Sequence, residues 1–268
     1  MKHFKQIVSE QKSDIIELKL ILEKEITNKI IPNKLFIGAL LTGSVARGDA
    51  RIKPFGIYID LALVVRNKNE IDLEKIFGKN AEPFIPYFCI KKTDKIGIAI
   101  ELIEENELWN IRDQNETTIF AKNESIILYD ETKILKKWKD ECFIITTDQV
   151  KTRALENYFR FTYLTDEYRF EKWNYRQAYI QIAQNLNEAA ECYLNFLYCI
   201  NKYFIPRKDW LVYLSYDLKI KPEEHTEYMD HLYTSSLTPH SIEQKNKIIE
   251  EISKWMKNYC QINTWLKN

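Results

Sequence analysis

Two apolar runs separated by a glycine-serine pair constrain the fold of this chain more than any other feature. The first run covers residues 35–41 and leads into Gly43-Ser44, and the second, residues 57–65, contains a single carboxylate at Asp60. This pattern predicts a strand, a tight turn into a helix, and a second strand that carries an acid. An acid inside an apolar strand is costly unless it is paired or bound to a metal ion, so Asp60 is a candidate functional residue.

The turn between the two strands suits a ligand with several phosphates. Glycine lets a backbone approach a ligand closely, and the N–H groups at the start of a helix favour anions. Gly43 and Ser44 occupy this turn. The sequence therefore predicts an anion-binding turn beside the acid of the second strand.

The segment that begins at Gly43-Ser44 resembles the signature loop of the DNA polymerase β-like nucleotidyltransferase superfamily, through the octet Gly43-Ser44-Val45-Ala46-Arg47-Gly48-Asp49-Ala50. That superfamily includes aminoglycoside, lincosamide and minimal nucleotidyltransferases. Its Gly-Ser loop grips the terminal phosphates of a nucleoside triphosphate, an Asp-x-Asp or Asp-x-Glu pair on the next strand holds two Mg²⁺ ions, and a later strand supplies a third acid. The resemblance implies transfer of a nucleoside monophosphate to a hydroxyl of a small molecule, antibiotics being one such class. It places the nucleotide contacts at Gly43, Ser44, Arg47, Asp49 and Tyr58.

The chain departs from the family pattern at the first metal-binding acid. The Asp-x-Asp position reads Tyr58-Ile59-Asp60, so Asp60 matches the second acid and a tyrosine stands in place of the first. The resemblance assigns the third acid to Glu101, which strand alternation puts on the same face as Gly97 and Ala99. Asp60 and Glu101 are thus the expected catalytic residues and the expected ligands of one or two Mg²⁺ ions. A phenol, with a reference pKa of about 10, adds no negative charge to this set.

Tyr58 leaves three interpretations open. The first is an active nucleotidyltransferase with a modified site. The second is a catalytically degenerate nucleotidyltransferase fold that binds a nucleotide or another ligand, or regulates a partner. The third is a coincidental motif in a different α/β protein.

The hydrophobic periodicity changes near residue 147, where strand signals stop and long helical periods begin. We expect an α+β protein, with a nucleotidyltransferase-like domain of mixed sheet and helices over residues 1–146 and an all-α helical bundle over 147–268. The aromatic residues between 158 and 175 are expected to lie mostly in the bundle core. Strands are predicted over 35–41, 57–65, 87–90, 96–103 and 126–130, and helices over 4–30, 72–77, 132–142, 150–167, 174–203, 210–218, 223–233 and 241–266.

The composition restricts the kinds of partner that this protein is expected to bind. The formal net charge is zero and the pI is about 6.9, so no basic field points to nucleic acid, and a small-molecule acceptor is favoured. The five cysteines lack Cys-x-x-Cys spacing and are expected to be reduced, buried thiols of a cytoplasmic protein. The sequence contains no signal peptide and no 18-residue apolar span, so no membrane partner is expected. A homodimer is left open as its assembly.

Overall fold

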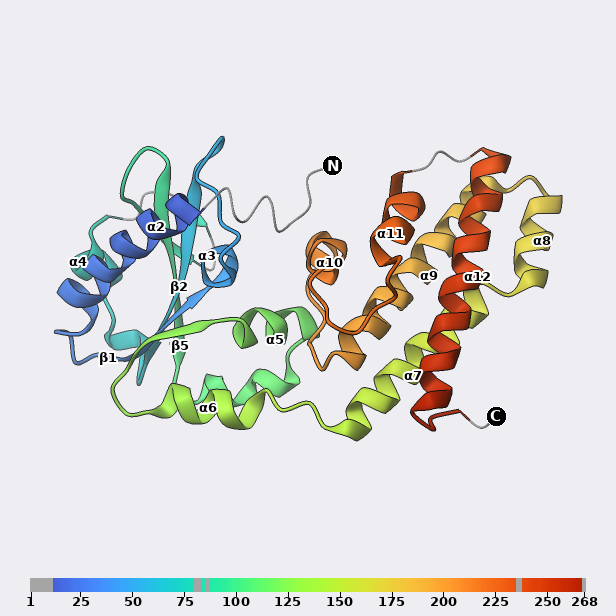
Figure 1. The fold of residues 1–268 in the computed structure, drawn as a ribbon. Coiled ribbons are helices and arrows are strands. Elements are labelled where there is room, and N and C mark those ends of the chain that lie inside the picture. Colours follow the sequence, from blue (N-terminus) through green and yellow to red (C-terminus); the bar gives the residue numbers. More distant parts are fainter. Residues whose placement is uncertain (1–11, 80–82, 85–86, 235–237, 267–268) are drawn as a thin grey trace. The chain divides into compact units, whose positions relative to one another are not determined.

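The computed structural model describes residues 12–79, 83–84, 87–234 and 238–266, and its internal contacts divide the chain into two units, Met1–Ile144 and Ile145–Asn268 (Figure 1). The boundary predicted from the sequence, between residues 146 and 147, lies two residues further along the chain than the boundary between these two units. The first unit contains the sheet and the second contains only helices among its described residues, so the predicted α+β class is confirmed.

A mixed sheet of six strands forms the centre of the first unit, in the order β3-β4-β5-β2-β1-β6. Strand β2 pairs in parallel with β5, and the other pairings are antiparallel. All five strands expected from the sequence are present. Pro83 belongs to the edge strand β3, where proline is tolerated because an edge strand pairs on one side only. The strands are β1 Phe36–Thr42, β2 Ile57–Val65, β3 Pro83–Phe84, β4 Tyr87–Lys91, β5 Ile96–Glu104 and β6 Ile126–Asp130.

Helices cover both faces of this sheet, because successive side chains of β1, β2 and β5 alternate between two apolar clusters. One cluster joins Leu18 and Leu22 of α2 (Lys12–Glu25) and the π-helical turn Ile26–Ile30 to one face. The other cluster joins Leu135 and Trp138 of α6 (Ile134–Cys142) and the 3₁₀ segment Glu107–Asp113 to the opposite face. The helix predicted over 4–30 is confirmed from residue 12 onward, and residues 4–11 lie outside the described residues.

The sequence did not predict helix α5 (Glu116–Asn123), which follows the Glu107–Asp113 segment. Asn115 caps its first turn, since the Asn115 side chain accepts a hydrogen bond from the Thr118 N–H at 2.9 Å. The helix is short and mostly polar, which left no clear hydrophobic period to detect. The described residues of the unit also include three further short helices: α3 Gly43–Arg47, the 3₁₀ turn Lys68–Glu70, and α4 Leu73–Phe77.

The second unit is a helical bundle built around α9 (Tyr179–Ile200), whose buried residues contribute much of its core. Helix α9 contacts each of the other described helices of the unit. These are α7 Thr147–Leu164, α8 Glu167–Tyr175, α10 Lys208–Ser215, α11 His225–Thr234 and α12 Pro239–Ile262.

Two expectations for the bundle were wrong. The helix expected over 174–203 begins only at Tyr179, because the backbone turns at Gln177, whose φ of 54° is left-handed. Residues 167–175 form a separate helix, α8, although no helix was expected over 168–173. The aromatic residues of this region also divide more evenly than expected between core and surface. Tyr158 and Phe161 are buried on the inner face of α7, whereas four others are exposed: Phe159 (55%), Tyr163 (51%), Tyr168 (71%) and Tyr175 (91%).

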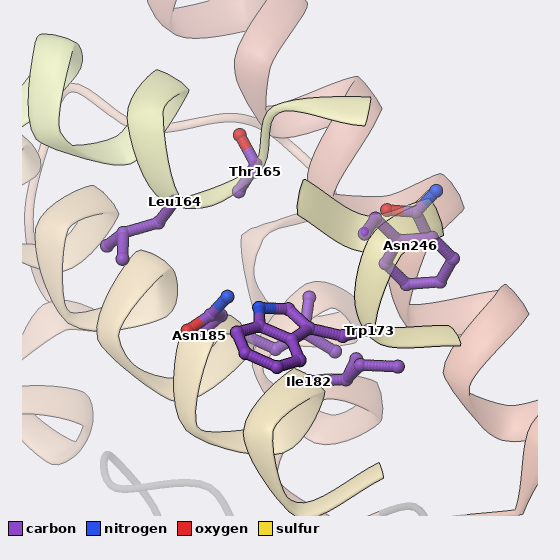
Figure 2. Close-up of a pocket in the computed structure, with 8 residues that line it drawn as sticks. Leu164, Thr165, Trp173, Ile182, Asn185 and Asn246 are labelled. Atoms are coloured by element: carbon purple, nitrogen blue, oxygen red, sulfur yellow. The ribbon is translucent and has the colours of Figure 1, made fainter. Parts of the chain in front are cut away.

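A small pocket lies between α7, α8, α9 and α12 in the bundle. It is lined by Leu164, Thr165, Phe170, Trp173, Ile182, Asn185, Leu186 and Asn246. Figure 2 shows the Trp173 indole beside Ile182 and Asn185. The space has room for about one water molecule.

A fully buried chain of polar side chains crosses the bundle core from α9 to α10 and α11. The Ser215 hydroxyl donates to the Val212 carbonyl at 2.7 Å, so Ser215 Oγ accepts from His225 Nε2, 2.8 Å away. His225 Nδ1 then accepts from the Tyr193 hydroxyl at 2.9 Å. Each buried polar atom of this chain is satisfied when His225 is neutral and carries its proton on Nε2.

Candidate functional site

The Gly43 turn and the acid of the second strand are in direct contact. Gly43 begins α3 with a φ of +68°, and a Cβ built on it would lie 2.0 Å from Asp60 Oδ2. Thr42 pairs with Asp60 across the β1–β2 ladder, and its hydroxyl donates to the Asp60 carbonyl at 3.4 Å. Only glycine therefore allows the Asp60 carboxylate to lie against the start of α3. The Ser44 carbonyl closes the turn behind it, accepting from the N–H groups of Gly48 and Asp49 at 3.0 Å each.

Tyr58 lies on the same face of the sheet as Asp60, two residues earlier in β2. It pairs with Gly97 of β5, and a Cβ on Gly97 would lie 2.3 Å from Tyr58 Cε1. The phenol ring thus covers Gly97, which leaves room for it because it has no side chain. The position that the resemblance assigns to the first metal-binding acid is thus filled by a phenol ring.

Glu101 also faces this side of the sheet, since it pairs with Ala62 while Asp60 pairs with Ala99. Strand spacing puts the Asp60 and Glu101 Cα atoms about 8 Å apart. Glu101 Oε2 lies 2.5 Å from the Nζ atom of Lys122, in the last turn of α5. Lys122 was missed by the sequence reasoning. The signal that could have predicted this contact is the helix-capping pattern Asn115-Glu116-Thr117-Thr118 at the start of α5. It indicates a helix after β5, and Lys122 would lie at the end of that helix.

Arg47 and Asp49 pair with each other at the end of α3. Arg47 Nε lies 3.1 Å from Asp49 Oδ2, and Asp49 is only 8% exposed. Burial raises the pKa of Asp49, and the charge of Arg47 opposes this rise. The two side chains, predicted as nucleotide contacts, brace the turn through this ion pair.

Lys139 of α6 forms hydrogen bonds with the carbonyl groups at the end of α5. Its ammonium donates to the carbonyls of Lys122, Asn123 and Ser125 at 2.9, 2.6 and 2.8 Å. Burial lowers the pKa of Lys139 to about 8, an effect that the neighbouring Glu124 carboxylate partly offsets. Burial likewise raises the pKa of Glu124, against the charges of Lys139 and Arg47. These contacts fix the helix turn that presents Lys122 to Glu101.

The side chains present do not fit a centre of two Mg²⁺ ions. Such a centre needs several carboxylate oxygens, because Mg²⁺ is a hard cation. Here the first acid position is an uncharged ring over Gly97, and the Glu101 carboxylate already contacts the Lys122 ammonium. In the part of the chain that the structure describes, no group of three or more His, Cys, Asp or Glu residues is arranged to hold a metal ion.

No protein-family model matches this chain, and no curated protein matches it either. Among solved structures, it is similar to one described as a nucleotidyltransferase-like protein from Exiguobacterium sibiricum 255-15. The two chains are 12% identical with a TM-score of 0.40, and the match covers 92% of this chain and 75% of the other.

No helix in the described residues is long and apolar enough to cross a membrane. The five cysteines are all free and buried, as expected from their spacing.

Gly43→Ala is expected to destabilise the first unit by about 2 kcal/mol, because the new methyl group is strained at positive φ and collides with Asp60. Gly48→Ala is the matched control. Gly48 also has a positive φ, +84°, but a Cβ there would meet nothing within 4 Å, so about 1 kcal/mol of backbone strain is expected. Chemical denaturation of both variants measures the difference. Equal losses would mean that Asp60 does not lie against Gly43.

Proposed function

We propose that the first unit binds a nucleoside triphosphate and that its ability to perform two-metal nucleotidyl transfer is lost. The observation that carries this proposal is the contact between Glu101 and Lys122, Oε2 to Nζ, at 2.5 Å. In a two-metal mechanism, paired Mg²⁺ ions hold the attacking and leaving oxygens. A carboxylate engaged by an ammonium group is a poor ligand for one of those ions.

Nucleotide binding is supported by the residues of the site that match the superfamily pattern. The Gly43-Ser44 turn, which resembles a phosphate-binding loop, lies directly against Asp60. Thr42, Tyr58, Asp60 and Glu101 all face the same side of the sheet. Their shared face gives the ligand a common surface, while Tyr58 removes one charge that metal binding would need.

A second candidate is an active transferase that moves a nucleoside monophosphate to a hydroxyl of a small molecule, with a single Mg²⁺ ion at Asp60. The close contact of the Asp60 carboxylate with Gly43 favours it, because an acid beside the phosphate-binding turn is what a metal bridging to the phosphates would require. The two candidates differ in whether pyrophosphate is released.

The Tyr58→Asp variant distinguishes between these two candidate functions. Wild type is expected to bind ATP or GTP in calorimetric titrations without releasing pyrophosphate above background, with or without hydroxyl-bearing acceptors. Tyr58→Asp adds a carboxylate beside Asp60 and is expected to bind the Mg²⁺–nucleotide complex about tenfold more tightly, about 1.4 kcal/mol. Tyr58→Phe, which keeps the ring over Gly97, is the control and should stay close to wild type. Rapid pyrophosphate release by wild type, unchanged in Tyr58→Asp, would favour the transferase.

A further inference from the structure

Helix α8 of the bundle carries its positive and negative side chains on different sides. Its Phe170 and Trp173 pack against the bundle core, and Figure 1 shows α8 at the edge of the bundle. Residues three or four positions apart share a side of a helix, so the spacing in α8 separates its acids from its basic residues. The acids are Glu167 and Glu171, and the basic residues are Arg169, Lys172 and, directly after the helix, Arg176. The formal net charge of zero for the whole chain therefore conceals a positive side on this helix.

Two tyrosine rings border the positive side of α8 and are open to solvent. Tyr168 is 71% exposed and Tyr175 is 91% exposed. The two residues are two helical turns apart, so they lie along one line of the helix, about 10 Å from each other. The flat apolar face of a tyrosine ring gains free energy when a second planar group stacks on it. These two rings are therefore available to a ligand that carries several flat groups in a row.

The basic side chains of α8 lie over aromatic rings. The guanidinium carbon of Arg169 is 3.7 Å from the centroid of the Tyr163 ring, which belongs to α7. The Trp173 ring has the Lys172 ammonium 4.5 Å from its centroid and the Arg176 guanidinium carbon 5.4 Å from it. A cation on the face of a ring keeps its charge, and its N–H groups can donate to a ligand at the same time. The rings thus hold three positive charges along α8, beside the two exposed tyrosines.

We propose that this side of α8 binds single-stranded nucleic acid. The α8 face, as we call it, is formed by Tyr168, Arg169, Lys172, Tyr175 and Arg176. A single strand offers unpaired bases that stack on exposed aromatic rings and phosphates that pair with neighbouring cations, and both kinds of contact are provided here.

The α8 face suits two other kinds of partner less well. A helix that binds a membrane surface inserts an apolar face, and α8 contains no aliphatic residue. An acidic peptide would pair with the cations but would leave both tyrosine rings without a stacking partner. All residues of the α8 face belong to the second unit, so this proposal is independent of nucleotide binding by the first.

Fluorescence anisotropy of labelled oligo(dT) and oligo(rU), each about 15 nucleotides long, tests the proposal with the full chain. A saturating non-hydrolysable ATP analogue is present, so that a nucleotide site in the first unit is not measured. Wild type is expected to bind both oligonucleotides. The double variant Tyr168→Ala with Tyr175→Ala should bind them about tenfold more weakly or worse, because each ring stacks on a base. The double variant with phenylalanine at the same two positions keeps the rings and should bind like wild type. Tyr203→Ala, at a tyrosine outside the α8 face that is 42% exposed, is the matched control and should also bind like wild type.

The salt dependence of binding tests the cations of the α8 face. If three phosphates are neutralised, the logarithm of the association constant falls with the logarithm of the salt concentration with a slope of about −2. Lys172→Ala should make this slope shallower by about 0.7. Lys208→Ala, at an exposed lysine of α10, makes the same change in net charge and should leave the slope as in wild type.

Three results would overturn the proposal. One is wild type that binds neither oligonucleotide. Another is wild type that binds only polyglutamate or only vesicles of equal phosphatidylcholine and phosphatidylglycerol. The third is an equal loss in the variants of the α8 face and in their controls, with far-UV circular dichroism showing that all are folded. The affinity for the ATP analogue should be the same in wild type and in all of these variants, so the outcome for the first unit is read separately.

Discussion

Trp138→Ala is expected to lower the free energy of unfolding of the first unit by about 4 kcal/mol, since truncating a buried tryptophan removes a large apolar surface and leaves a cavity. Trp138 is fully buried between α6 and the sheet, and its ring meets that of Phe143 edge-on at 4.8 Å. Its indole N–H donates to the Leu108 carbonyl at 2.7 Å. The same helix carries Lys139, so the loss should also loosen α5 and the Lys122 contact.

Trp138→Phe is the control for this prediction. It keeps most of the apolar volume and removes the donor to Leu108, so a smaller loss of about 1–2 kcal/mol is expected. Native-state hydrogen exchange of the β1 and β2 amides reports on the first unit separately from the bundle. A loss under 1 kcal/mol for Trp138→Ala would show that α6 does not pack on the sheet through this side chain.

Acid is expected to destabilise the bundle through His225. Burial lowers the pKa of His225 to about 4, with a smaller contribution in the same direction from Lys221. An unfolded chain has a histidine pKa of about 6.5. Between these two values the unfolded state binds a proton that the folded state does not, so stability is complete above about pH 6.5 and falls as the pH drops toward 4. The loss attributable to His225 is about 3 kcal/mol.

The difference between wild type and His225→Gln isolates this contribution from that of the carboxylates. Glutamine offers a donor and an acceptor to Tyr193 and Ser215 but does not titrate in this range. Denaturation midpoints measured at several pH values from 7 to 4 should fall less steeply in the variant. Parallel curves would show that the buried chain does not keep His225 neutral.

The sequence predicted which side chains share a face of the sheet wherever this depended only on the chain near each residue. The apolar runs predicted β1, β2 and β5, and alternation within β2 and β5 is enough to put Tyr58, Asp60 and Glu101 on one face. Gly43, which leaves room for the Asp60 carboxylate, was identified as part of the octet, but its contact with that carboxylate was not predicted.

Lys122 and α8 were beyond that reasoning for two different physical reasons. Lys122 meets Glu101 through tertiary packing of a short, polar helix, which carries no periodic signal. Helix α8 ends in a tight turn at Gln177, whose left-handed backbone is unusual for a residue other than glycine. A pattern based on hydrophobic spacing runs through such a turn without interruption, so the helix predicted over 174–203 began five residues before α9, and α8 was not predicted as a helix of its own.

The parallel pairing of β2 with β5 brings the two acids of the candidate site together. Adjacent antiparallel strands such as β1 and β2 can pair locally, whereas β2 and β5 must first close the long segment that includes β3 and β4. Asp60 lies on β2 and Glu101 lies on β5, so the two acids come together only when these strands pair. A ligand that contacted both acids would therefore add its binding energy to the stability of this strand pair, because only the folded sheet brings the two residues together.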